Sequence, residues 1–195
     1  MATSDLFTAA ASGDASAVQA AIDAGAELDA RGAEGMTALV AATKTNHVDA
    51  ALVLIEAGAD VNAKDDIQDS AYLYAGARGH NEILEATLAN GADLKSTNRY
   101  GGTALIPASE RGHLKTVQIL IDAGVDPNHV NNLGWTALHE AIVLGDGAAV
   151  YVDIVRALVA GGADVTIPDG SGVSPRDLAS DHGYSEIVAE IDRAG

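Results

Sequence analysis

Two kinds of residue recur along this chain at one shared spacing, and that period constrains the fold more than any other feature. Turn glycines separated by 33, 33, 33 and 38 residues are Gly25, Gly58, Gly91, Gly124 and Gly162. Hydroxyl residues with the same four spacings are Thr37, Ser70, Thr103, Thr136 and Ser174. A period of this length predicts a solenoid of stacked repeats, because one repeat alone is too small to bury its apolar face.

Each repeat has the same plan of a turn, a short helix, a glycine break and a second, apolar helix. In the second repeat, Thr37 is a suitable N-cap for a first helix that runs to Lys44. Ala51, Leu54 and Ile55 form the apolar stripe of its second helix. We expect one domain over residues 1–195, with repeats at about 4–28, 29–61, 62–94, 95–127, 128–165 and 166–195. The first and last of these read as caps that face water on one side.

Several repeated motifs carry a family resemblance. The run Gly134-Trp135-Thr136-Ala137-Leu138-His139 resembles the G-x-T-P-L-H signature of ankyrin repeats, and Gly58-Ala59-Asp60-Val61-Asn62 resembles their G-A-D-V-N turn. Gly79-His80 and Gly112-His113 resemble the G-H that separates the two ankyrin helices. The chain departs from the signature where alanine replaces its proline in four repeats. The resemblance implies a mainly α ankyrin solenoid of six helix pairs, with hairpins near 29–36, 62–69, 95–102, 128–135 and 165–173.

Three irregularities interrupt the period. Gln68 stands where the other repeats have glycine, and Tyr72 replaces the usual leucine. Pro107 lies four residues after Thr103 and should distort the first turn of that helix. Five extra residues fall in the fifth repeat, within Asp146–Val152, and we expect them to lengthen a loop and add about one turn to the second helix. Tolerated drift and a hairpin reshaped for a partner are both open explanations for Gln68 and Tyr72.

Composition narrows the class of protein. The formal net charge of −17 is the opposite of the basic footprint that nucleic-acid binders show. Residues 1–30 lack a basic start followed by an apolar block, so they do not read as a signal peptide. No apolar run approaches the length of a membrane span. We therefore expect a soluble, cytoplasmic monomer; a secretory signal removed from the chain is the open alternative.

Catalytic and metal-binding patterns are missing from the sequence. There is no cysteine, no G-x-S-x-G turn and no G-x-x-x-x-G-K-[ST] loop. His47, His80 and His113 share one repeat position, which favours hydrogen bonds to neighbouring backbone over metal binding. Carboxylates that share one turn position are read as turn caps, since they lack the spacing of calcium loops; they are Asp60, Asp93, Asp126 and Asp164. We expect no catalytic residue, cofactor or metal site.

The resemblance implies a concave binding face built from the hairpins and the inner ends of the first helices. Six of the 11 basic residues but only five of the 28 acidic ones fall at these positions, so the face carries about +1 and the rest of the chain about −18. The candidate partner-binding residues are Trp135, Tyr100, Arg99, Arg111, Arg78, Lys64, Glu110 and Leu133. We expect Trp135 to be exposed there.

The leading functional hypothesis is a non-enzymatic module that binds a protein partner on this face. An enzyme with a dispersed acid or histidine site is a weaker alternative, because solenoids present grooves rather than enclosed pockets. An engineered or purely structural scaffold is a third alternative, against which the insertion, Gln68 and Pro107 all count. A partner that presents an apolar residue flanked by carboxylates would suit Trp135, Tyr100 and the arginines.

Overall fold

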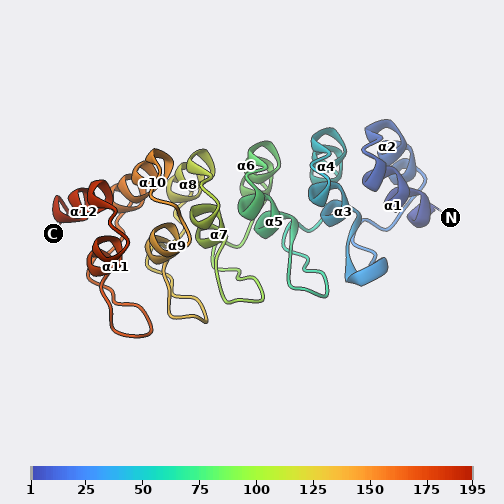
Figure 1. The fold of residues 1–195 in the computed structure, drawn as a ribbon. Coiled ribbons are helices and arrows are strands. Elements are labelled where there is room, and N and C mark those ends of the chain that lie inside the picture. Colours follow the sequence, from blue (N-terminus) through green and yellow to red (C-terminus); the bar gives the residue numbers. More distant parts are fainter. Residues whose placement is uncertain (1, 195) are drawn as a thin grey trace. The chain divides into compact units, whose positions relative to one another are not determined.

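The computed structural model describes residues 2–194 and consists of paired short helices joined by turns (Figure 1). The pairs are α1 (Ala2–Ser12) with α2 (Ala15–Asp23), α3 (Ala38–Lys44) with α4 (Val48–Glu56), α5 (Ala71–Arg78) with α6 (Asn81–Ala89), α7 (Leu105–Glu110) with α8 (Leu114–Asp122), α9 (Ala137–Val143) with α10 (Ala149–Ala160), and α11 (Pro175–Asp181) with α12 (Ser185–Asp192). A 3-10 turn, η1 (Ala33–Gly35), lies in the first connection. The predicted mainly α fold with six helix pairs is confirmed.

The chain divides into two compact bodies, which are described separately below. The first body holds the residues up to Ala75 together with His80–Arg99, and the second holds Gly76–Gly79 and the chain from Tyr100 onward. In the first body α1 packs on α3, α2 on α4, and α4 on α6. In the second body α7, α9 and α11 form one row, and α8, α10 and α12 form a parallel row (Figure 1). That residues 1–195 act as a single domain stays a prediction.

The predicted stripes of short aliphatic residues build the core of each body. Ala51, Leu54 and Ile55 of α4 are buried, as are Val117 and Leu120 of α8. The sequence of the last repeat predicts a buried stripe of Val188 and Ile191 on α12, and the structure differs in one position. The buried residues of α12 are Ile187 and Ile191, whereas Val188 is only half-buried, because the helix is turned one position further than the sequence stripe indicated.

The sequence predicts Asp14, Thr37 and Thr103 as helix N-caps; the first two caps form, and the third does not. The side chain of Asp14 accepts a hydrogen bond from the Ala17 N–H, and Thr37 accepts one from Val40. Thr103 was expected to cap α7. Its hydroxyl is instead buried without a hydrogen-bond partner, and α7 begins only at Leu105. In a regular helix the N–H of residue 107 would donate to the Thr103 carbonyl, but proline has no N–H. The Ile106 N–H donates to this carbonyl instead. The predicted distortion at Pro107 therefore also removes the predicted cap.

The five-residue insertion lengthens α10 as expected. This helix has 12 residues, whereas α4, α6 and α8 have nine each. Both α8 and α10 end two residues before a turn glycine, at Asp122 and Ala160, so the extra residues extend α10 at its N-terminus. The remaining inserted residues lie in the loop, where the side chain of Asp146 accepts a hydrogen bond from the Ala148 N–H.

The connections between helix pairs are tight turns, and residues 2–194 contain no assigned β-strand. Turns in both bodies are closed at the base by a backbone bond, such as Asp65 N–H to the Asp69 carbonyl and Asn131 N–H to the Trp135 carbonyl. The position occupied by glycine in the other repeats needs a positive φ, and Gln68 adopts φ 67° there. Gln68 therefore carries backbone strain that glycine would avoid.

Candidate functional site

Side chains that act as turn caps explain the carboxylates that recur at one turn position. Oδ1 of Asp60, Asp93, Asp126 and Asp164 accepts a hydrogen bond from the backbone N–H two residues later, at 2.8–3.0 Å. Asn62 in the first body and Asn128 in the second link successive turns by bonding to the carbonyls of Gly91 and Gly162. Residues 2–194 contain no cluster of three or more His, Asp or Glu that could hold a metal ion.

A ring-bearing residue at the start of the second helices ties neighbouring pairs together. Nδ1 of His80 donates to the Thr43 carbonyl, which confirms the expected backbone bond for this histidine. Tyrosines continue the series in the second body: the hydroxyl of Tyr151 donates to the Glu110 carbonyl, and that of Tyr184 to the Gly145 carbonyl. Tyr151 and Tyr184 follow His113 at spacings of 38 and 33 residues, so the period could have revealed them.

The adjacent residues Asp181 and His182 predict a solvent-exposed side-chain pair, and this pair does not form. Both residues are exposed, but Nδ1 of His182 donates to the Leu178 carbonyl. His129 similarly bonds to the carbonyl of Gly101 at 2.7 Å. His80, His129 and His182 therefore bond to the backbone.

One position recurs at the tips of the hairpins, and we call it the tip position. In three of the five hairpins it carries an exposed, large apolar side chain. Its occupants are Glu34, Ile67, Tyr100, Leu133 and Ser171. Ile67 in the first body is 46% exposed, while Tyr100 and Leu133 in the second are 56% and 60% exposed. A hydrogen bond from Asn132 N–H to the Tyr100 carbonyl, at 3.0 Å, joins the hairpin tips that carry Tyr100 and Leu133. Tyr100 and Leu133 thus form an apolar patch on adjacent, connected hairpins.

Trp135 differs from the expectation. It lies at the base of the hairpin and is half-buried, not exposed. The reason is that Trp135 is bonded to Asn131 on both sides of its backbone. Its N–H donates to Asn131 Oδ1 and its carbonyl accepts from the Asn131 N–H, which fixes Trp135 at the hairpin base. Met36, Asp69 and Val173 occupy the same position in other repeats and are also half-buried.

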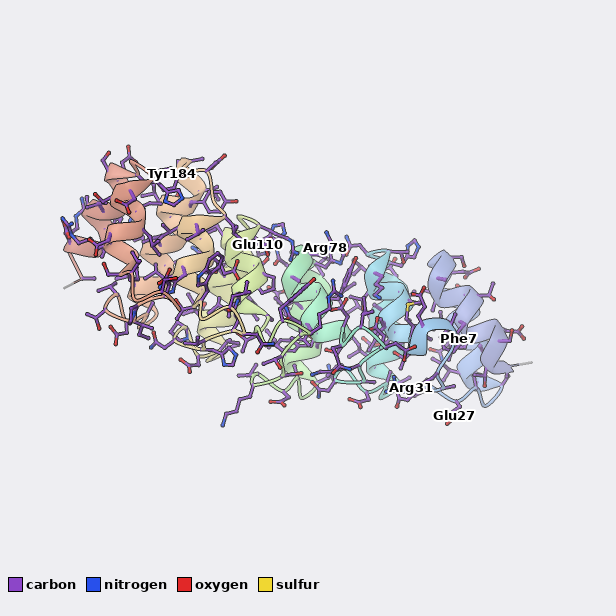
Figure 2. All side chains as sticks on the ribbon, turned by 60° about the horizontal axis from the view of Figure 1, so that its bottom comes forward. Phe7, Glu27, Arg31, Arg78, Glu110 and Tyr184 are labelled. Atoms are coloured by element: carbon purple, nitrogen blue, oxygen red, sulfur yellow. The ribbon has the colours of Figure 1, made fainter. Side chains whose placement is uncertain are left out.

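The remaining predicted residues of the second body lie at the far ends of the first helices. Arg78 ends α5, Glu110 ends α7 and Arg111 follows it (Figure 2). A helix of six residues is about 9 Å long, so α7 separates this group from the hairpin. Arg111 donates to the Ala77 carbonyl and its other nitrogen lies 3.7 Å from Glu110. Figure 2 shows Arg78, Glu110 and Tyr184 along one edge of the molecule.

Lys64 and Arg99 belong to the first body. The Lys64 ammonium is half-buried and donates to the Thr97 carbonyl at 2.7 Å, so it connects successive hairpins. Arg31 connects the preceding pair of hairpins by donating to the Lys64 carbonyl. Arg99 is exposed. Arg31 and Lys64 therefore hold hairpins of the first body in register, a role that their 33-residue spacing could have indicated.

Sequence reasoning missed a buried carboxyl beneath the face. Glu140 on α9 is 5% exposed, and its Oε1 accepts a hydrogen bond from Asn131 Nδ2 at 2.8 Å. Burial and the nearby charge of Glu110 raise the pKa of Glu140 to about 7, although Asn131 and Arg111 act in the opposite direction. Burial lowers the pKa of its neighbour His139. Glu140 is bonded to the hairpin through Asn131, and the charges of Glu110 and Arg111 at the end of α7 act on it.

Comparisons with known proteins identify the family. The ankyrin repeat family model (three copies) matches residues 3–65 and 72–169, so the chain belongs to the ankyrin repeat family. It is similar to the crystal structure of an ankyrin repeat domain from Acinetobacter baumannii AYE, with 56% identity, 97% of each chain covered and a TM-score of 0.95. A second solved ankyrin repeat protein is 41% identical over 98% of each chain, with a TM-score of 0.94. No curated protein matches the chain.

The family sets the general role. Ankyrin repeats are protein-interaction modules and are typically non-enzymatic. In residues 2–194 no helix has the length and apolar character needed to cross a membrane.

Proposed function

We propose that this protein is a non-enzymatic interaction module that docks a protein partner on the hairpin and first-helix face of its second body. The observation that carries the proposal is the pair of exposed apolar side chains at adjacent tip positions, Tyr100 and Leu133. Large apolar side chains held on connected, well-ordered turns lose little conformational freedom on binding. Tyrosine is also among the residue types that dominate interface energetics.

The charges at the far ends of α5 and α7 indicate the partner's chemistry. Arg111 remains 36% exposed although it donates to the Ala77 carbonyl, and Arg78 is exposed on the neighbouring pair. Glu110 is the acidic member of this group. A partner that presents an apolar side chain flanked by carboxylates would place that side chain at Tyr100 and Leu133 and its carboxylates toward the arginines. Arg111→Ala should weaken binding chiefly at low salt, because rim charges are screened.

Trp135 contributes from the side of the hairpin in this proposal. Trp135 is only half-buried and so remains partly accessible to a partner, and Trp135→Ala should weaken binding by about 2 kcal/mol, as is typical of interface hot spots. Arg99 and Lys64 lie in the first body and are tested separately. Lys64 is the less suitable of the two, since its ammonium already bonds to the Thr97 carbonyl.

A comparison of three baits tests the proposal. Wild-type protein, a Tyr100→Ser/Leu133→Ser variant and an Ile67→Ser variant would each capture proteins from a lysate of the source organism. Ile67 occupies the same tip position in the first body, so Ile67→Ser is a matched control for loss of an exposed apolar side chain. We expect one protein to be captured by the wild type and by Ile67→Ser, and to be lost with the double variant. Equal capture by all three would place the site elsewhere.

A further inference from the structure

In the hairpin at 128–135, the side chain of Asn131 holds the backbone of the tip and of the base. Its Oδ1 accepts hydrogen bonds from the N–H groups of Leu133 and Trp135, at 2.9 and 3.1 Å. Its Nδ2 must then face the other way, and it donates to Oε1 of Glu140. The hairpin tip, the Asn131 amide and a buried carboxyl on α9 therefore form one continuous hydrogen-bonded chain. Asn131 itself is 7% exposed, so water competes little with these bonds.

Another hairpin shows the same arrangement with a different anchor. In the first body, Oδ1 of Asp65 accepts from the N–H groups of Ile67 and Asp69, and its Oδ2 is bound by the ammonium of Lys44 at 2.6 Å. That hairpin is held by an ion pair with the Lys44 ammonium, whereas the hairpin at 128–135 is held by the buried carboxyl of Glu140.

We infer that the protonation state of Glu140 controls how firmly the hairpin bearing Leu133 and Trp135 is held. A carboxylate accepts a stronger hydrogen bond than a neutral carboxylic acid does. The Asn131 bond lowers the pKa of Glu140, and by linkage the same bond is strengthened when Glu140 loses its proton. The hairpin is therefore tighter above the midpoint of about 7 and looser below it. This inference rests on the proposed function, because the hairpin is part of the proposed docking face.

In the hydrogen-bonded chain that runs from the hairpin tip to α9, Glu140 is the group that titrates near neutral pH. Glu110 and Arg111, from the end of α7, act on it with opposite signs. Tyr151 of α10 bonds to the Glu110 carbonyl, and burial and nearby acids raise its pKa, so it stays neutral. His139 on α9 is fully buried with a lowered pKa, and Asp169, whose charge acts on it from the next hairpin, has its own pKa lowered by turn hydrogen bonds.

The test uses the protein without any partner. Amide hydrogen exchange of Leu133 and Trp135, corrected for the intrinsic effect of pH, should speed up roughly fivefold from about pH 8 to about pH 6, as expected when a charge-assisted hydrogen bond becomes a neutral one. Trp135 is the only tryptophan, so its fluorescence should change with the same midpoint. In Glu140→Gln both changes should vanish. In Glu110→Gln they should persist with a lower midpoint, because the repulsion that favours protonated Glu140 is gone.

The hairpin at 165–173 provides an internal control. Oδ1 of Asp169 accepts from the N–H groups of Ser171 and Val173 in the same way, but Asp169 stays ionised over this range. Exchange at Ser171 and Val173 should therefore not change. Absence of a transition in the wild type, or its persistence in Glu140→Gln, would overturn the inference. Either result would leave the proposed function intact, since that proposal is tested by partner capture.

Discussion

Asn131 and Glu140 join a hairpin tip to the helix that follows it, through a hydrogen bond of 2.8 Å in a buried setting. Glu140 makes no ion pair within residues 2–194, so its charged form is not compensated by a cation in direct contact. The result is a folded state that favours neutral Glu140, even though the Asn131 bond itself favours the carboxylate. The stability of the fold and the tightness of the hairpin therefore respond to pH in opposite directions.

Replacement of Glu140 by glutamine should stabilise the protein at alkaline pH. The folded pKa of about 7 lies above the usual 4.5, so the wild type has its full stability below pH 4.5 and loses part of it as pH rises toward 7. Each pKa unit corresponds to about 1.4 kcal/mol, so the loss is at most about 3 kcal/mol. Urea denaturation at about pH 8 should show Glu140→Gln to be the more stable protein, and at about pH 4.5 the two should agree. Equal stability at both pH values would contradict the raised pKa.

The hydroxyl of Tyr72 is buried with no hydrogen-bond partner, and burial raises its pKa. Tyr72→Phe removes that unsatisfied group and should stabilise the protein by about 1 kcal/mol. Tyr151→Phe is the matched control, because the Tyr151 hydroxyl donates to the Glu110 carbonyl and its loss should destabilise by about 1 kcal/mol. Chemical denaturation of both variants measures the two signs. A destabilised Tyr72→Phe would show that this hydroxyl does have a partner, such as bound water.

Gln68 adopts a positive φ at a position where other repeats have glycine. Gln68→Gly should relieve that strain and stabilise the protein by about 1 kcal/mol, less the extra entropy that glycine gives the unfolded chain. The reverse change at Gly101, which has φ 73°, should destabilise; there a side chain would also collide with Asn132. Thermal melts of Gln68→Gly and Gly101→Gln should move in opposite directions. A shift of both in the same direction would argue against backbone strain at Gln68.

Deletion of Asp146–Val150 should restore the 33-residue period and preserve the fold. The deletion joins Gly145 directly to Tyr151, which reproduces the Gly112-His113 and Gly183-Tyr184 pairs of neighbouring repeats. Tyr151 could then still reach the Glu110 carbonyl, as it does in the native protein. Helical circular dichroism should be retained and unfolding should stay cooperative. Loss of cooperativity in the deletion variant would show that the inserted turn of α10 is required for packing.

The repeat period predicted most of the fold because it marks positions that every repeat must use. Asp14 and Thr37 form the expected caps, since an N-cap depends only on local sequence. Thr103 does not form its cap, because Pro107 has no N–H to bond to the Thr103 carbonyl. The Ile106 N–H bonds to that carbonyl, and the Thr103 hydroxyl is left without a partner. Val188 was assigned to the buried stripe in place of Ile187, since two adjacent apolar residues fit the helical period almost equally well.

The candidate site was less predictable because it depends on contacts between repeats. Tyr100 and Leu133 could be assigned to the tip position from the period alone, and both are exposed. The burial of Glu140 could not, since its slot holds Pro107 and Tyr74 in earlier repeats and nothing in the sequence pairs it with Asn131. Trp135 was expected to be exposed because its counterparts share no apolar character, but Met36, Asp69 and Val173 at the same position are half-buried too, so the hairpin base itself covers part of the residue.

The central claim is that Tyr100 and Leu133 anchor a protein partner. The most direct measurement is calorimetric titration of the captured partner into wild type, Tyr100→Ser, Leu133→Ser, the double variant and Ile67→Ser, with thermal melts to confirm that each is folded. Each single variant should lose about 1–3 kcal/mol of binding free energy, and Ile67→Ser should bind like the wild type. An affinity unchanged by the double variant, with the fold intact, would contradict the account.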